Sequence, residues 1–323
     1  MRHVRLGETE LNVSRICFGT WQTGGEWGAI DTEQAKSAAR RALELGINFF
    51  DTAQAYGWGI SERLLGEALA PEIRSRRDEI VIATKGGLTQ DDDRPRNAGR
   101  DWLRRGIEQS LRELGTDYVD IYQPHWPDPG TPIEETAGAL QEFVDEGKTR
   151  YVGVSNFGVA ELEALGEYRR ADTLQPPYHM LRREIEDEIL PYCREHAIGV
   201  LVYSPLASGL LSGKFDPERE FAAEDWRKGS STFDPDAIER NLAIIGELGR
   251  YAEQRGWTLP QLAIAWVLSA PGVDVAIAGA RVPEHIEGTA PAGDFELTEE
   301  DRGEIDEILE GAVPLGGPSP ESK

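Results

Sequence analysis

The chain of 323 residues is predicted to fold as a (β/α)8 (TIM) barrel, an α/β fold in which eight parallel strands close into a ring. Short apolar runs typical of strands alternate along the whole chain with amphipathic stretches typical of helices. This alternation indicates parallel βαβ units, and eight strands suffice to close a barrel. Since no linker or shift in composition divides the chain, residues 1–323 are expected to form a single domain.

The eight apolar runs predict the barrel strands in chain order. They lie at residues 16–20, 47–52, 80–85, 119–124, 151–156, 173–178, 199–205 and 275–280. Amphipathic segments such as 32–46, 99–115 and 132–147 predict the intervening helices, and each ends in glycine, a common helix stop. The alternative fold is a doubly wound open sheet, but its G-x-G-x-x-G fingerprint is missing because Glu62 stands where the third glycine is required.

Two further segments are expected to decorate the barrel. Residues 2–14 resemble a hairpin that precedes the first barrel strand and could plug the bottom of the barrel. Residues 207–235 form a long polar loop after strand seven, on the face where active sites of such barrels lie. Long loops in compact domains are usually functional or disordered, and this position favours function.

The composition limits the possible partners and surroundings of the protein. The net charge is −24, from 34 basic and 58 acidic residues, which argues against nucleic acid as a partner. Two cysteines, no apparent signal peptide and no apolar run of membrane-spanning length together predict a cytoplasmic protein without a membrane partner. The acidic surface indicates either adaptation to high salt, as in a halophile, or an ordinarily acidic protein encoded by a GC-rich genome.

Four titratable residues lie at or just past the carboxyl ends of predicted strands: Asp51, Tyr56, Lys85 and His125. Carboxyl ends of parallel strands open onto one face, so these side chains are expected to converge. A tyrosine beside a lysine and an aspartate is a suitable proton donor. The ammonium group lowers the pKa of the phenol, and the carboxylate keeps the lysine charged and in place.

Segments that carry these residues resemble the aldo-keto reductase family. They are RLGETELNVSRICFGTW, DTAQAYGWGISERLLGEAL, IATK, QPHWPDP, GVSNF, YSPLASGLLSGKF and AIAGARVPEHIEG, in the family's order. The loop sequence EDWRKGSSTF is similar to the bacterial and archaeal branch related to potassium-channel β subunits. The resemblance implies that Tyr56 is the general acid, that Lys85, paired with Asp51, lowers its pKa, and that His125 orients the carbonyl group or helps to relay the proton.

The resemblance also implies a site for NADPH or NADP, with NADH possible. Ser155, Asn156 and Gln175 would hydrogen-bond the nicotinamide carboxamide, and the ring of Tyr203 would stack under the nicotinamide. The residues implied along the pyrophosphate are Ser204, Leu206, Ser208, Gly209 and Leu211, with Lys214 close by. The residues implied at the adenosine end are Gly279, Ala280, Arg281 and His285, where the guanidinium of Arg281 suits a 2′-phosphate. The family's usual Gln, Glu and Asn are replaced at this end by His285, Gly288 and Thr289.

Four tryptophans after predicted strands suggest an aromatic pocket for small or flat aldehydes and ketones: Trp21, Trp27, Trp58 and Trp126. Trp27 could equally be a loop anchor. Three others, Trp102, Trp257 and Trp266, fall inside predicted helices and are expected to pack in the fold. The predicted function is reduction of small carbonyl compounds by a monomer or weak homo-oligomer. The alternative is an NADPH-sensing regulatory subunit with little turnover. A metal-dependent hydrolase is disfavoured because the five histidines are scattered, so no metal is expected.

Overall fold

The computed structural model describes residues 1–216, 218, 221, 225–228 and 235–315. Its centre is a closed barrel of eight parallel strands, which confirms the predicted fold. Neighbouring strands follow one another in chain order, and the last pairs with the first. The strands are β3 (Ile16–Gly19), β4 (Phe49–Asp51), β5 (Val81–Gly86), β6 (Val119–Pro124), β7 (Thr149–Ser155), β8 (Thr173–Gln175), β9 (Gly199–Val202) and β10 (Val275–Gly279).

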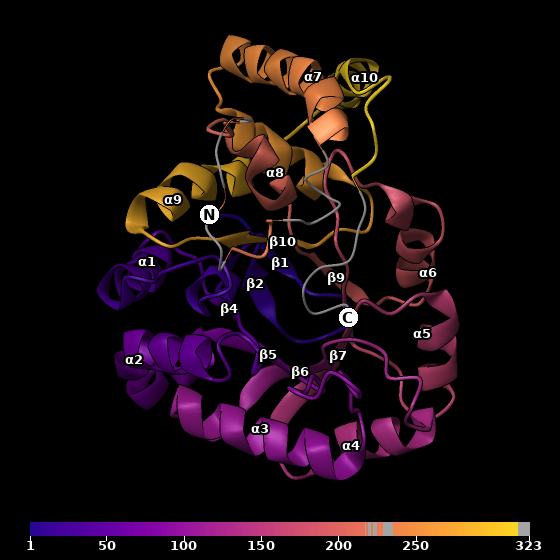
Figure 1. Ribbon diagram of the computed structural model, residues 1–323. Coiled ribbons are helices and arrows are strands. Elements are labelled where there is room, and N and C mark those ends of the chain that lie inside the picture. The colour runs from indigo at the N-terminus through magenta and orange to yellow at the C-terminus, as the bar shows by residue number, and fades with distance from the viewer. Residues whose placement is uncertain (217, 219–220, 222–224, 229–234, 316–323) are drawn as a thin grey trace.

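Helices surround the barrel, as Figure 1 shows. The described helices are α1 (Thr32–Glu44), α2 (Ile60–Ser75), α3 (Arg100–Leu114), α4 (Ile133–Asp145), α5 (Val159–Gly166), α6 (Ile189–Glu195), α7 (Pro235–Gln254), α8 (Leu259–Ser269), α9 (Pro283–Thr289) and α10 (Glu299–Ile308). The predicted glycine stops are confirmed, because Gly46, Gly115 and Gly147 all adopt positive φ after α1, α3 and α4. Among the helices described, none is both long and apolar enough to cross a membrane.

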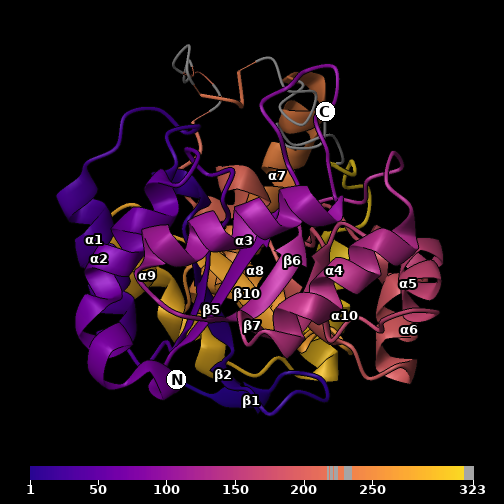
Figure 2. The same ribbon diagram turned by 90° about the horizontal axis from the view of Figure 1, so that it is seen from below.

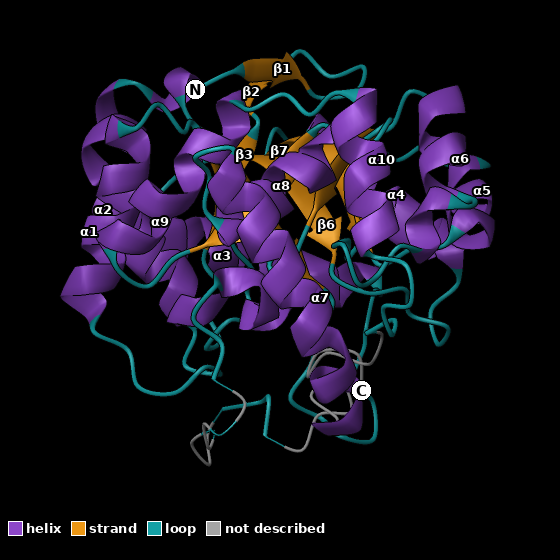
Figure 3. Ribbon diagram, turned by 90° about the horizontal axis from the view of Figure 1, so that it is seen from above, coloured by secondary structure: helices purple, strands orange, loops and turns teal. Residues whose placement is uncertain are grey.

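The predicted hairpin is present and closes one end of the barrel (Figures 2 and 3). Strands β1 (His3–Arg5) and β2 (Asn12–Ser14) pair antiparallel. Leu6, Leu11 and Val13 are buried against the side chains that point into the barrel, including Phe49. The turn lies tight against β9, since a Cβ on Gly7 would come within 2.4 Å of the Gly199 nitrogen. The hairpin therefore fills the amino-terminal end of the barrel, and a pocket can open only at the other end.

Four polar side chains at this closed end accept hydrogen bonds from backbone N–H groups of the preceding strand or its approach. The pairs are Asn48 with Ser14 (2.7 Å), Asp120 with Ile82 (2.9 Å), Asp172 with Val152 (2.9 Å) and Asp274 with Val200 (3.0 Å). They lie at every second strand junction, between β3 and β4, β5 and β6, β7 and β8, and β9 and β10. These bonds satisfy donors at the bottom rim of the barrel, where the ladder begins.

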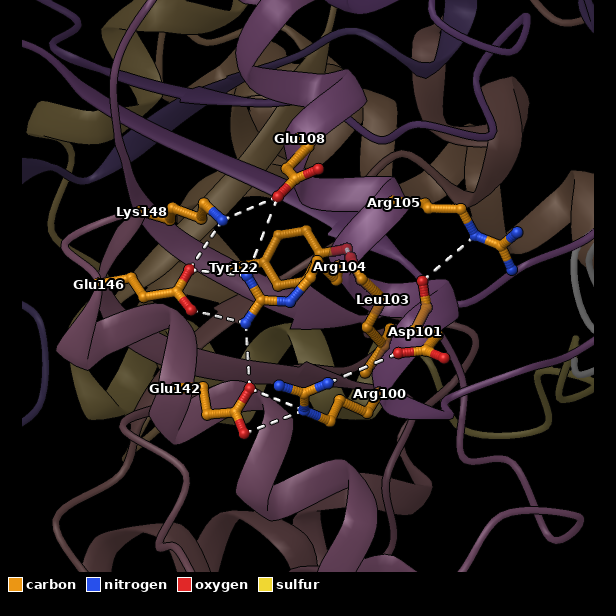
Figure 4. Close-up of polar contacts among 10 residues, drawn as sticks. All are labelled: Arg100, Asp101, Leu103, Arg104, Arg105, Glu108, Tyr122, Glu142, Glu146 and Lys148. Atoms are coloured by element: carbon orange, nitrogen blue, oxygen red, sulfur yellow. Dashed lines mark hydrogen bonds and ion pairs between the residues drawn. The ribbon is translucent and has the colours of Figure 1, made fainter.

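A network of ion pairs joins α3 and α4 to the start of β7 (Figure 4). Arg104 contacts Glu142 at 3.0 Å and Glu146 at 2.6 Å, and Lys148 contacts Glu146 at 2.7 Å and Glu108 at 2.9 Å. The members are partly exposed, and single pairs of this kind usually contribute 0 to about 1 kcal/mol. The network therefore fixes the relative position of two neighbouring helices more than it stabilises the whole domain.

Candidate active site

A cavity of about 400 Å³ lies at the carboxyl ends of the barrel strands. Its walls come from the loops after β3, β4, β6, β7, β9 and β10, which confirms that one face of the barrel carries the pocket. Predicted residues that line it are Trp21, Trp27, Asp51, Tyr56, His125, Trp126, Ser155, Asn156, Gln175, Tyr203, Ser204, Leu206, Ser208, Gly209, Gly279, Arg281 and His285.

Lys85 is the centre of the polar contacts beneath this cavity. Its ammonium group donates to Asp51 Oδ1 at 2.6 Å and to the carbonyl oxygen of Thr52 at 2.9 Å, and it lies 3.3 Å from the hydroxyl of Tyr56. The other carboxylate oxygen of Asp51 accepts from Gln175 Nε2 at 2.9 Å. The side chains of Asp51, Tyr56 and Lys85 are all buried. The structure thus brings the predicted lysine, aspartate and tyrosine into direct contact.

His125 packs against the ring of Tyr56. The two rings meet edge to face with centroids 5.6 Å apart. Burial, with the charge of Lys85 adding to it, holds the pKa of His125 well below its usual range. The imidazole is therefore neutral at neutral pH, so one ring nitrogen carries a proton and can donate a hydrogen bond, while the other can accept a hydrogen bond. Burial raises the pKa of Asp51, while the ammonium of Lys85 and the hydrogen bond from Gln175 oppose that rise.

The segment that carries Tyr56 is held close to the loop after β3. Gly57 has φ +61, and a Cβ at this position would come within 2.3 Å of the carbonyl oxygen of Gly24. Its N–H donates to Glu26 Oε1 at 2.9 Å. Only glycine combines that conformation with so close an approach, so the sequence YGWG fixes the path of the chain beside the phenol.

Polar residues at the ends of β7 and β9 form one hydrogen-bonded group along the wall of the cavity. Asn156 Nδ2 donates to the carbonyl oxygen of His125 and to Ser155 Oγ, both at 3.0 Å, and Tyr203 donates from its hydroxyl to Asn156 Oδ1 at 2.8 Å. The loop that follows β9 enters the short helix η4 (Ala207–Ser212) with positive φ at Ser204, Ala207, Ser208 and Gly209. Such successive turns can direct several backbone N–H groups toward an anion.

Arg281 lies at the far end of the cavity, past β10. Its guanidinium donates to the carbonyl oxygens of Trp27, at 3.2 Å, and Ala29, so it holds the loop after β3. The backbone N–H of Arg281 lies 3.4 Å from His285 Nδ1. Burial, and then the charges of Lys214 and Arg281, lower the pKa of His285.

Aromatic rings form part of the cavity lining. Trp21 meets Trp27 edge to face at 5.0 Å and stacks on Trp226 at 5.4 Å, and Trp126 also lines the cavity. Trp27 also pairs with Asp225 through a backbone bridge, so it both lines the cavity and anchors its loop. Trp102 on α3 donates to the carbonyl oxygen of Leu88, and the buried Trp266 on α8 stacks on Tyr178, both as expected. The prediction that Trp257 lies inside a helix is wrong, because it falls between the end of α7 and the start of α8, where it stacks on Phe295.

Some predicted site residues lie away from the cavity lining. Trp58 is 37% exposed and is not part of the wall. Leu211 and Ala280 are buried in the core, and Lys214 is exposed beside η4. Residues 229–234 of the polar loop, which include the whole of GSSTF, lie outside the described residues.

The cavity also contains residues that the sequence did not single out, and Arg227 is the most notable. Its guanidinium pairs with Asp225 at 2.6 Å, lies 4.7 Å from the ring centroid of Trp27 and donates to the carbonyl oxygen of Ser208 at 3.3 Å. The sequence feature that could have identified Arg227 is its place in EDWRK, inside the loop expected to contribute to the site. Gly19 at the end of β3, with Thr20 and Gln22 just after it, also lines the cavity.

Comparisons with known proteins agree on one family. The family model described as Aldo/keto reductase family matches residues 15–310. The chain is 38% identical to "Aldo-keto reductase YhdN" of Bacillus subtilis, covering 98% of this chain and 96% of that protein. It is 36% identical to a "Probable voltage-gated potassium channel subunit beta" of Arabidopsis thaliana (91% and 92%) and 32% identical to the "NADH-specific methylglyoxal reductase" of Escherichia coli (96% and 99%).

Solved structures give the same result. The glycerol dehydrogenase AKR11B4 from Gluconobacter oxydans superposes with a TM-score of 0.86 at 36% identity, covering 98% of both chains. An aldo-keto reductase from Klebsiella pneumoniae in complex with NADPH superposes with a TM-score of 0.76 at 32% identity, covering 97% of this chain and 95% of that chain.

Proposed function

This chain belongs to the aldo/keto reductase family, and we propose that it is an oxidoreductase that uses NADP(H) to reduce an aldehyde or ketone to an alcohol. The observation that carries the proposal is the position of the Tyr56 hydroxyl. It lies 3.3 Å from the ammonium of Lys85, beside a neutral imidazole, on the lining of a closed-bottomed cavity. A phenol held this way can give a proton to a carbonyl oxygen.

The cavity suits a cofactor that carries phosphate groups. In a chain with a net charge of −24, the charged groups that the described residues place on its lining are the guanidiniums of Arg227 and Arg281 and the carboxylate of Asp51, which is paired with Lys85. Guanidinium groups bind phosphate oxygens through paired hydrogen bonds. The ring of Tyr203 and the polar group of Ser155, Asn156 and Gln175 offer a flat face and amide partners for a nicotinamide.

Each catalytic side chain then has a separate task. A reduced nicotinamide bound beside these residues would supply a hydride to the carbonyl carbon. Tyr56 donates its proton to the carbonyl oxygen, and the ammonium of Lys85 stabilises the phenolate that remains. Asp51 keeps Lys85 charged and fixed at 2.6 Å. His125 positions the carbonyl oxygen against the phenol through a ring N–H, since a neutral imidazole is a donor that does not compete as an acid.

The second candidate is an NADPH-binding regulatory subunit with little turnover, favoured by the likeness to the probable channel subunit of Arabidopsis thaliana. Such a subunit must bind another protein. Among the described residues, the large hydrophobic side chains that are exposed are Trp58 and Tyr168, which offer little apolar surface for a stable partner. This favours the enzyme, acting as a monomer or a weak homo-oligomer.

The two candidates differ in one measurement. Consumption of NADPH and of NADH is followed by absorbance with a panel of small aldehydes, ketones and sugars, at low and high KCl, and cofactor binding is measured in parallel. Turnover of at least one carbonyl compound with NADPH, lost in Tyr56→Phe, is expected for the reductase. Tight NADPH binding with no turnover across the panel would support the regulatory subunit instead.

A further inference from the structure

Glu62 differs from the other buried carboxylates of the molecule. It lies on α2 and its side chain is fully buried. Asp51, Glu72, Asp120 and Asp225 are also buried, and each has a lysine or arginine at ion-pair distance. Glu62 has no such partner among the residues that the structure describes. A buried carboxyl without a counter-charge is costly, so its position calls for a physical reason.

The hydrogen bond of Glu62 joins it to the strand that carries Lys85. Thr84 donates from Oγ1 to Glu62 Oε1 at 2.6 Å. Thr84 and Lys85 are consecutive on β5, so their side chains leave opposite faces of the strand. Thr84 points outward to α2, and Lys85 points into the barrel to Asp51 and Tyr56. The hydrogen bond between Glu62 and Thr84 therefore helps to fix the backbone of β5 that carries Lys85.

Glu62 is also tied to the segment that carries Tyr56. Helix α2 begins at Ile60, and the N–H of Ser61 donates to the carbonyl oxygen of Tyr56 at 3.2 Å. The hydroxyl of Ser61 donates to the carbonyl oxygen of Thr20 at 2.6 Å. These bonds make residues 56–62 one short, fixed piece. The bond between Glu62 and Thr84 thus links the piece that holds the phenol to the strand that holds the ammonium.

We propose that Glu62 is a positioning residue of the reductase site and that, through Thr84, it sets the separation between the Tyr56 hydroxyl and the Lys85 ammonium. The inference rests on the proposed function, in which Tyr56 is the proton donor. The separation is 3.3 Å, longer than most N–H···O hydrogen bonds, so a small shift of α2 against β5 would break the contact.

The protonation state of Glu62 gives this role a dependence on pH. Burial raises the pKa of Glu62 to about 7, and the hydrogen bond from Thr84 opposes the rise. The other charged or titratable groups that act on it are Glu113 from α3, Lys85 from β5 and Tyr122 from β6. Glu62 therefore changes charge near neutral pH. As a neutral acid or as a carboxylate it can accept from Thr84, but only the carboxylate adds a negative charge behind β5.

Three variants test the proposal in the full-length protein. Glu62→Leu removes the acceptor for Thr84 and should lower kcat by about ten- to a hundredfold, with the KM for NADPH changed by no more than about twofold. Glu62→Gln keeps an acceptor oxygen without a titrating group. It should keep kcat within about threefold and flatten the pH dependence of kcat near neutrality.

Glu72→Gln is the matched control. Glu72 is a second buried glutamate of α2, but it pairs with Arg40 and Arg76 away from the cavity. Its substitution should leave kcat and the pH profile of kcat unchanged. Thermal melts of all the variants show whether each is folded.

A readout that needs no turnover separates this inference from the proposed function. NMR of protein labelled with 13C in the tyrosine ring follows the titration of Tyr56, assigned by Tyr56→Phe. Glu62→Leu should move that titration to higher pH, because the phenolate loses its contact with Lys85, and Glu72→Gln should not. If wild-type protein reduces no carbonyl compound, the proposed function fails, and this titration still tests the position of Tyr56.

Two results would overturn the inference. In one, folded Glu62→Leu keeps the wild-type kcat, pH profile and Tyr56 titration, which leaves the reductase assignment intact. In the other, Glu62→Leu does not fold and Glu62→Gln shows the pH profile of wild-type enzyme, which means that the charge of Glu62 does not reach the site.

Discussion

The two ends of the barrel each contain a buried aspartate paired with a basic residue, but they use the pair differently. At the closed end, Asp120 accepts from Arg77 at 2.8 Å, Arg150 at 2.9 Å and the backbone N–H of Ile82 at 2.9 Å. At the open end, Asp51 accepts from Lys85 at 2.6 Å and from Gln175 at 2.9 Å. Both carboxylates are satisfied. The difference lies in what else the cation touches.

Arg77 also donates to the backbone carbonyl oxygens of Ile80 and Tyr118 and to the hydroxyl of Thr116. All of these belong to the fold, so the pair only holds strands together. Lys85 instead contacts the hydroxyl of Tyr56, which borders a cavity. Two ion pairs of the same kind therefore have different effects. The enclosed Asp120–Arg77 pair stabilises the fold, whereas the cation of the Asp51–Lys85 pair acts on the hydroxyl of Tyr56, which a ligand in the cavity can contact.

The sharpest test of this comparison removes the cation at each end. Lys85→Met should lower kcat of the folded protein by about a thousandfold, because the phenolate loses its stabilising charge. It should also destabilise the protein, because the buried Asp51 then keeps Gln175 but loses its cation. Arg77→Met should destabilise the protein by roughly 1.5–3 kcal/mol, because the buried carboxylate of Asp120 loses one charged hydrogen-bond partner while Arg150 remains, and the variant should keep its activity at low temperature. Steady-state kinetics and urea unfolding of both variants measure the two effects. Equal loss of activity in both would break the comparison.

The second test uses pH, because burial raises the pKa of Glu62 from 4.5 to about 7. Between these values the folded protein binds more protons than the unfolded chain, so this group makes the free energy of unfolding fall as pH rises from about 4.5 through about 7. The loss amounts to roughly 3 kcal/mol. Glu62→Gln should remove it, so the variant should gain stability relative to wild type at pH 8 but not at pH 4.5. Denaturant unfolding at both pH values measures it, and a constant difference would contradict the assignment.

The third test concerns the open end alone. Arg281→Ala should weaken NADPH binding by about ten- to a hundredfold through loss of a charge-assisted contact to the 2′-phosphate. NADH lacks that phosphate and should be affected much less. Arg281 also holds the carbonyl oxygens of Trp27 and Ala29, so a loosened loop would weaken both cofactors alike. Fluorescence titrations with both cofactors separate these outcomes.

The smallest expected effect concerns the whole surface. A net charge of −24 makes the fold self-repulsive at low ionic strength, and the Debye length falls from ~30 Å at 0.01 M to ~3 Å at 1 M. We expect the Tm to rise by a few degrees with KCl into the molar range, with activity maintained. Screening also weakens exposed ion pairs such as Arg104 with Glu146, which limits the gain. A flat or falling Tm, with activity lost, would favour an ordinary acidic protein.

The strands and the contact of Asp51, Tyr56 and Lys85 were predictable because each depends on a local signal. An apolar run marks a strand, and a parallel barrel places every strand end on one face. Contacts that depend on how α2 and β5 pack were not predictable. In the sequence, Glu62 was informative only because it occupies the third glycine position of the G-x-G-x-x-G pattern. Its hydrogen bond with Thr84 appears only in the folded chain.

Loop residues were the hardest to place. Arg227 and Trp58 both lie in segments expected to serve the site, yet only Arg227 lines the cavity. Trp58 has φ +51 and its side chain is 37% exposed. A positive φ is uncommon for a bulky residue, so the sequence did not predict this position. The sequence also did not predict the four polar acceptors at the closed end, Asn48, Asp120, Asp172 and Asp274. Each accepts from a backbone N–H of a different strand or its approach, and these four residues are irregularly spaced along the chain.

The central claim is that Tyr56 is the proton donor of a carbonyl reductase. Turnover of the best carbonyl substrate by Tyr56→Phe, measured together with its affinity for NADPH, tests it most directly. The substitution removes only the hydroxyl that lies 3.3 Å from Lys85. We predict that kcat falls by about a thousandfold or more while the Kd for NADPH stays within about threefold. Turnover near that of wild-type enzyme, with NADPH still bound, would contradict the claim.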